Sequence, residues 1–239
     1  MIKSIFIMLF EFFKTATVSN IEIDERFSKN RVFIFLFIIN LAIGILLTGL
    51  SGYLRIKFDI SFKISTSSVH TIWLLNLLFV PLIEELAYRL PLIFRKRNIL
   101  ISSIAITYIF ISQLFSDGII DINTNLSAKL LSISLIGTIL VAMLSKNSIE
   151  KKAISFWNKN PRSVLFSYLI IFSLGHFDNY IFSVQLLILF PVLVLPQFIG
   201  GFFLSFVRVK VSFIHAIIFH VLNNFLALFP QIVLFYIVN

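Results

Sequence analysis

The feature that most constrains this chain is a series of apolar runs, each about 20 residues long, which is the length that crosses a bilayer as a helix. Hydrophobic residues make up 59% of the 239 residues and charged residues only 13%. A soluble core of this size would need far less apolar sequence. The sequence therefore predicts an all-α, polytopic transmembrane helical bundle. We expect about seven spans, within a range of six to eight, at roughly 31–54, 69–94, 98–115, 126–144, 163–177, 180–207 and 212–238.

The run 180–207 differs from the others because it contains Pro191, Pro196 and two consecutive glycines, Gly200 and Gly201. Proline interrupts the hydrogen bonding of a helix and bends it. We expect this run to be kinked, or to form two shorter helices. The same small and cyclic residues also suit close packing between helices.

The N-terminal stretch MIKSIFIMLFEFFK is too short to span a bilayer. It contains Glu11 and lacks a small-residue cleavage site, so we do not expect a cleaved signal peptide. Its apolar residues recur at helical spacing, which suits a helix in the membrane interface or, equally, an ordinary packed amphipathic helix. We expect an N-terminal amphipathic segment over 1–30 and a single transmembrane domain over 31–239.

The net charge of +9 is explained by where the basic residues lie. Most of the 20 Lys and Arg residues fall in the segments that would share one side of the membrane, including Arg95, Lys96 and Arg97. The positive-inside rule then places the N-terminus in the cytoplasm and the C-terminus outside. This charge can attract anionic lipid head groups, and no nucleic-acid partner is predicted. The absence of cysteine excludes disulfides, a thiolate nucleophile and cysteine-ligated metal.

Three ionisable residues, Glu84, Glu85 and Arg89, lie inside the apolar stretch FVPLIEELAYRLPLIF. Each would cost about 2.5–3.5 kcal/mol at the centre of a spanning helix if it were unpaired. Adjacent residues point about 100° apart on a helix, so one carboxylate can pair with Arg89 while the other faces a cavity. Glu85 and Arg89 are four positions apart, which places them on one helix face. A cost of this size indicates a function.

Three further polar residues lie at similar depth on other spans. At 1.5 Å per residue, Glu84, His176, His220 and Asn224 lie about 16, 21, 12 and 18 Å from the cytoplasmic edge. Phe172 with His176, and His220 with Asn224, are each spaced four apart and share a helix face. The sequence therefore predicts one buried polar site.

Such a site can perform acid–base chemistry. A carboxylate beside a neutral imidazole can remove a proton from water, and the resulting hydroxide can attack a peptide carbonyl. A second histidine and an asparagine can stabilise the oxyanion. Two histidines and a glutamate, here Glu84, His176 and His220, are also a zinc ligand set with an open position. No HExxH motif is present. The preferred interpretation requires no cofactor, and zinc remains the alternative.

Three ordered motifs resemble those of the CPBP family, which comprises the CAAX proteases and bacteriocin-processing enzymes and is also called Abi. EELAYR resembles EExxxR, FSLGH resembles FxxxH, and HVLNN resembles HxxxN. The resemblance covers about residues 69–229. Ile83 stands where the family often has glycine, and Asp178 follows the second motif closely enough to influence His176.

The resemblance implies an intramembrane endopeptidase like the type II CAAX prenyl endopeptidase, in a bacterial cytoplasmic membrane. Glu84 and His176 would then activate the water. His220 and Asn224 would hold the oxyanion or ligate metal, with Glu85, Arg89 and Phe172 as supporting residues. The substrate would be a membrane-associated protein or peptide, such as a prenylated CAAX tail, a leader peptide or a peptide precursor.

Two other classes of function remain open. A non-catalytic scaffold or a bacteriocin self-immunity protein of the same fold is the main alternative. A proton- or ion-coupled transporter also uses buried glutamate and histidine, but an internal inverted repeat typical of many transporters is not evident.

Overall fold

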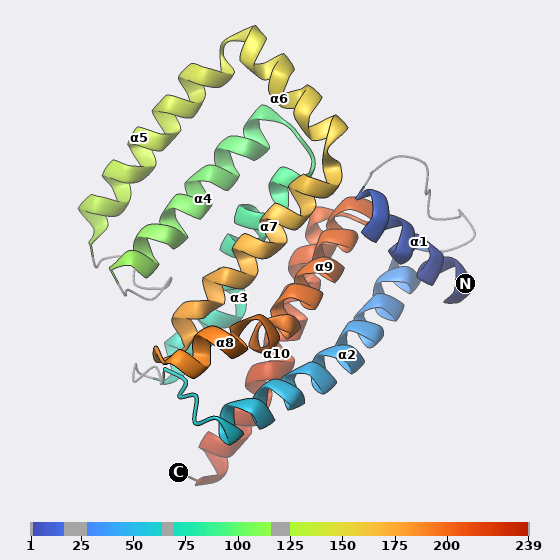
Figure 1. Cartoon of the computed structure of the whole chain (residues 1–239), viewed down its shortest axis with the longest axis vertical. Helices are drawn as coiled ribbons and strands as arrows, with labels where there is room; N and C mark the ends of the chain where they lie inside the picture. The colour runs from blue at the N-terminus through green and yellow to red at the C-terminus, as the bar shows by residue number, and fades with distance from the viewer. Residues whose placement is uncertain (1, 17–27, 64–68, 116–124, 239) are drawn as a thin grey trace. The chain divides into compact units, whose positions relative to one another are not determined.

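The computed structural model describes residues 2–16, 28–63, 69–115 and 125–238, the side chains of 69–76 and 230–238 excepted (Figure 1). These residues form α-helices joined by short connections and 3₁₀ turns. The elements are α1 (Ile2–Thr15), α2 (Lys29–Lys57), α3 (Val69–Tyr88), η1 (Leu90–Leu92), α4 (Lys96–Leu114), α5 (Leu126–Leu144), α6 (Asn147–Lys159), α7 (Pro161–Gly175), η2 (His176–Asn179), α8 (Val184–Leu193), α9 (Leu195–Lys210) and α10 (Phe213–Val238).

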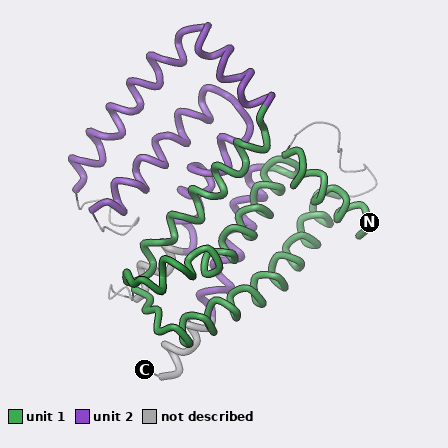
Figure 2. The backbone as a smooth tube through the Cα atoms, viewed as in Figure 1, with its two compact units in different colours: residues 1–66, 160–212 green, residues 67–159, 213–239 purple. Residues whose placement is uncertain are grey.

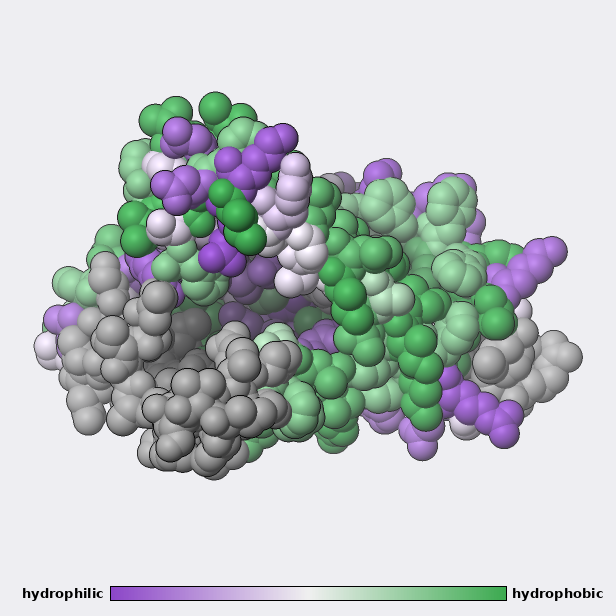
Figure 3. Space-filling model, turned by 90° about the horizontal axis from the view of Figure 1, so that it is seen from below, coloured by the Kyte–Doolittle hydropathy of each residue, from purple (hydrophilic) through white to green (hydrophobic). Residues whose placement is uncertain are grey.

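The predicted all-α helical bundle is confirmed. Within the described residues, β-pairing is limited to a single isolated bridge between Phe62 and Tyr180. Four helical stretches are long and apolar enough to cross a membrane, and Figure 3 shows hydrophobic side chains over large parts of the displayed face. They indicate a membrane protein. These stretches are α2, α4, α5 and the combined α8–α9 segment Val184–Lys210.

The interrupted run near residue 190 forms two helices, as expected. α8 ends at Leu193 and α9 begins at Leu195, Val194 caps both helices, and Pro196 occupies the first turn of α9. Proline is well tolerated there because the first helical N–H groups have no partner inside the helix. The backbone N–H of Val194 still bonds to the carbonyl of Phe190, at 3.0 Å.

The N-terminal stretch forms helix α1, which packs against α7 and α9 along one face, and its position in the membrane interface stays a prediction. Ile5, Met8, Leu9 and Phe12 are buried along one face of α1. The ring of Phe12 lies 5.6 Å from the ring of Phe202 and 5.3 Å from that of Phe206, both on α9. Aromatic contacts of this kind fix the helix by burial and edge-to-face geometry.

The chain divides into two compact units (Figure 2). Unit 1 contains Met1–Thr66 and Asn160–Ser212, and unit 2 contains Ser67–Lys159 and Phe213–Asn239. In unit 1, α9 packs against α2 and α7. In unit 2, α4 packs against α3 and α5, and α10 packs against α3. Each unit therefore combines an early and a late stretch of the sequence.

Candidate functional site

Glu84 and Glu85 lie in the C-terminal half of α3, Arg89 follows its last residue, and α4 contacts this end of the helix. The buried Ser102 of α4 donates a hydrogen bond from Oγ to the carbonyl of Ala87, at 2.6 Å. The N–H of Arg89 bonds to the carbonyl of Glu85, at 3.0 Å, and extends the helical pattern by one residue. α4 therefore holds the backbone that carries the side chains of Glu84, Glu85 and Arg89.

Glu85 and Arg89 form the buried pair that their spacing predicts. Their side chains are 0% and 1% exposed, and Arg89 Nη1 lies 3.6 Å from Glu85 Oε1. Removing either charge would leave the other buried without its ion-pair partner, and this would strongly destabilise the folded protein. The prediction that one carboxylate neutralises the guanidinium is confirmed for Glu85.

His220 of α10 reaches both glutamates. Its Nδ1 atom lies 2.9 Å from Glu85 Oε1, and its Nε2 atom lies 3.4 Å from Glu84 Oε2. The His220 side chain is 8% exposed and that of Glu84 is 13% exposed. One imidazole therefore has a carboxylate at each nitrogen, in an almost buried setting.

The contact of His220 with Glu85 and its contact with Glu84 are of two different types. A neutral imidazole has one N–H donor and one acceptor nitrogen. The 2.9 Å contact is a hydrogen bond, so a neutral His220 donates from Nδ1 to Glu85. Its Nε2 atom then carries a lone pair and faces Glu84, another acceptor, across a gap longer than a normal hydrogen bond. A water molecule can donate one hydrogen to each of these acceptors.

Asn224 follows His220 by one turn of α10 and is partly buried. Residues four apart share a helix face, so its amide lies on the same side of α10 as His220. The Asn224 side chain is partly exposed, so a bound molecule can reach its amide. Its amide group is therefore a candidate donor for a bound substrate.

His176 and Phe172 belong to unit 1, at the end of α7. The Nδ1 atom of His176 donates to the carbonyl of Phe172, at 2.9 Å, and the two rings meet edge to face with centroids 4.9 Å apart. This contact confirms that the two residues share a helix face. It also gives a neutral His176 the same Nδ1–H tautomer as His220.

The segment after His176 is held by the loop that follows α2, an arrangement that was not predicted from the sequence. Asp178 forms an ion pair with Lys63, and the N–H of Lys63 bonds to the carbonyl of Asn179, at 2.9 Å. The bridge between Phe62 and Tyr180 continues this contact. The sequence suggested that Asp178 would act on His176, but its carboxylate is engaged by Lys63.

The candidate residues thus fall into two groups. Unit 2 brings together Glu84, Glu85, Arg89 and His220, while His176 and Phe172 lie in unit 1. The sequence argument assigned His176 to the water with Glu84, whereas the imidazole beside Glu84 within unit 2 is that of His220. The catalytic roles themselves remain predictions.

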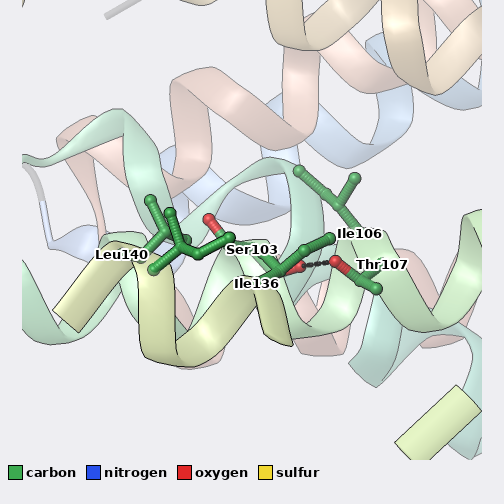
Figure 4. Close-up of a pocket in the computed structure, with 6 residues that line it drawn as sticks. Ser103, Ile106, Thr107, Ile136 and Leu140 are labelled. Carbon is green, nitrogen blue, oxygen red and sulfur yellow. Dashed lines mark hydrogen bonds between the residues drawn. The ribbon is translucent and has the colours of Figure 1, made fainter. Parts of the chain in front are cut away.

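A groove of about 370 Å³ lies elsewhere in unit 2, between α4 and α5 (Figure 4). Thr107 donates a hydrogen bond from Oγ1 to the backbone carbonyl of Ser103, at 2.7 Å. The described residues that line the groove include no acid or base, so it offers no proton chemistry. They are Ser103, Ile106, Thr107, Ile136, Ile139 and Leu140.

The zinc alternative fits this chain in part. Two ligands bound tetrahedrally at about 2.0–2.1 Å lie about 3.3–3.4 Å apart, which matches the gap between His220 Nε2 and Glu84 Oε2. Glu85 holds the other imidazole nitrogen, as carboxylates do behind zinc-bound histidines. However, the described part of the chain contains no group of three His, Cys, Asp or Glu side chains placed to hold a metal ion. We therefore derive no step through zinc.

Comparisons with protein-family models, with curated proteins and with solved structures found no match. The likeness to the CPBP family is therefore carried by the three short motifs.

Proposed function

We propose that this chain is an intramembrane endopeptidase that hydrolyses a peptide bond of a membrane-associated protein or peptide. The observation that carries the proposal is the His220 imidazole, which has Glu85 at one nitrogen and Glu84 at the other. A purely structural ion pair needs only Glu85 and Arg89. A second, slightly exposed carboxylate facing an acceptor nitrogen suits the activation of water.

In the proposed mechanism, a water molecule lies beside Glu84 Oε2 and His220 Nε2, at hydrogen-bond distance from both atoms. Glu84 accepts a proton from it while the water oxygen attacks the peptide carbonyl. The amide of Asn224 donates to the resulting oxyanion, and the proton on Glu84 passes to the leaving nitrogen as the C–N bond breaks. Glu85 fixes the His220 tautomer. His176 enters through its motif alone, as a further donor or acceptor at the reacting centre.

Peptide-terminus proteomics tests this proposal in cells of the native host that carry either the wild type or Glu84→Gln. The substitution keeps shape and removes the base, so we expect a set of membrane-protein termini to disappear. Losing a catalytic base typically lowers the rate by about 10²–10⁴-fold. Glu11→Gln, a partly buried glutamate of α1, is the matched control and should leave the termini unchanged.

Identical termini in wild-type and Glu84→Gln cells, with the cellular phenotype retained, would contradict the protease and favour a scaffold or self-immunity protein. His176→Ala in the same assay tests that residue separately. Retained cleavage there would remove His176 from the mechanism and leave the unit 2 cluster intact.

A further inference from the structure

α6 directly follows a helix that is apolar enough to cross a membrane. It starts at Asn147, and two residues separate it from the end of α5 at Leu144. This helix is α5, and only 6% of its most apolar 18-residue stretch is buried inside the protein. A helix that follows such a span after a two-residue turn begins where the hydrocarbon core gives way to head groups.

One face of α6 is held against the protein. The indole Nε1 of Trp157 donates to the carbonyl of Pro91, at 2.9 Å, and the Trp157 ring lies edge-on to Phe94. Glu150 forms an ion pair with Lys96, with Nζ and Oε2 2.7 Å apart. These contacts fix how α6 is rotated about its own axis, and they engage the helix's one acidic side chain.

The opposite face is basic and carries an exposed aromatic ring. Lys151, Lys152 and Lys159 are all exposed. Phe156 is 51% exposed and lies four residues after Lys152 and three before Lys159, so the three side chains share a stripe. An aromatic ring flanked by lysines is typical of a helix at the membrane surface, where the ring enters the head-group layer and the lysines reach the phosphates.

A second group of cations lies at the start of α4. Arg95, Lys96 and Arg97 are exposed there, and the ion pair between Lys96 and Glu150 ties this segment to α6. Clustered Lys and Arg residues next to a membrane span attract anionic lipid. The clustered cations, the exposed ring of Phe156 and the position of α6 after α5 all favour an anionic lipid as the partner.

We propose that the exposed face of α6 binds the phosphate groups of anionic phospholipids in the adjacent leaflet. The occupant is a lipid rather than free phosphate, because Phe156 offers apolar area that a free anion cannot use. The inference does not depend on the protease proposal.

Tryptophan quenching in nanodiscs tests it directly. The chain has two tryptophans, so Trp73→Phe leaves Trp157 on α6 as the sole fluorophore. We expect brominated phosphatidylglycerol to quench Trp157 more strongly than brominated phosphatidylcholine at equal mole fraction. The preference should fall with rising salt, because salt screens exposed charges.

The Lys151→Gln, Lys152→Gln, Lys159→Gln variant should lose this preference, by about fivefold in relative affinity for each lysine removed. Lys3→Gln, Lys14→Gln, Lys29→Gln is the matched control, because it removes the same charge from exposed positions of unit 1. Equal quenching by both lipids in the wild type would overturn the proposal. So would an unchanged preference in the α6 variant.

Discussion

His220 contacts two carboxylates that come from one turn of α3, and the two contacts have different consequences. The bond to Glu85 sets the tautomer of the imidazole and completes a buried cluster with Arg89. The contact with Glu84 is longer, at 3.4 Å, and leaves two atoms that a water molecule or an ion beside them can bridge. We therefore expect Glu85 to contribute mainly to stability and Glu84 to the proposed chemistry.

Glu85→Gln should therefore destabilise the protein, whereas Glu84→Gln should alter chemistry with a smaller loss of stability. Removing one partner of a buried ion pair costs about 3–5 kcal/mol, because the remaining charge stays desolvated. Thermal unfolding in detergent measures this for Glu85→Gln, Arg89→Met and the double variant.

The double variant should lose less stability than the sum of the two single changes, because it leaves no uncompensated charge. Additive losses would show that Glu85 and Arg89 contribute independently of each other.

The pairing of Glu85 with Arg89 and of Phe172 with His176 could be predicted because helical spacing alone fixes which residues share a face. The contact of His220 with both glutamates could not. It depends on the rotation of α10 against α3, which residue spacing within each helix does not specify. The same limit applies to the ion pair of Lys63 with Asp178, residues 115 positions apart.

At the scale of elements, a buried hydroxyl of α4 bonds to the backbone of the turn that ends α3. Ser102 bonds to the carbonyl of Ala87, which lies between the glutamates and Arg89 in the sequence. Helix ends leave carbonyls without partners inside the helix, and a buried one needs an external donor. The sequence predicted both helices but not this contact, because a serine inside a span has many candidate partners.

Ser102→Ala should cost about 1–3 kcal/mol of unfolding free energy, because it leaves the Ala87 carbonyl buried without its donor. Ser103→Ala is the adjacent control. Its side chain lines the groove on α4, so its loss should change stability by less than about 0.5 kcal/mol. Chemical denaturation in detergent measures both. Equal effects would show that the hydroxyl of residue 102 does not support the end of α3.

At the scale of the whole molecule, the predicted bundle and the break near residue 194 are confirmed because both follow from apolar run length and proline positions. α6 was not expected as a helix. Residues 147–159 were interpreted only as a basic connection between two spans. The composition of a short amphipathic helix rich in lysine is similar to that of a solvated loop, so composition alone did not predict the helix. α7 has 15 residues, fewer than the roughly 20 that a straight span needs, so the predicted number of spans remains a prediction.

Membrane topology can be measured with single cysteines, since the native chain has none. The ion pair between Lys96 and Glu150 requires residues 97 and 152 to lie on one side of the membrane. The positive-inside rule makes that side cytoplasmic. An impermeant maleimide should label Lys57→Cys in intact cells, and Arg97→Cys and Lys152→Cys only after permeabilisation.

Labelling of residues 97 and 152 from opposite sides would contradict the contact between α4 and α6. Labelling of both residues from outside would show that the orientation is the reverse of the predicted one, and it would be compatible with the same fold.

The division of unit 2 between two distant stretches of chain has a consequence during synthesis. His220 is 135 residues after Glu85, so at roughly 5–20 residues per second it emerges from the ribosome about 7–27 s later. Through that interval the nascent protein holds both carboxylates and the guanidinium without the imidazole that joins them. The arrival of α10 therefore completes the cluster late in synthesis, and an unfinished polypeptide would lack the imidazole that the proposed chemistry requires.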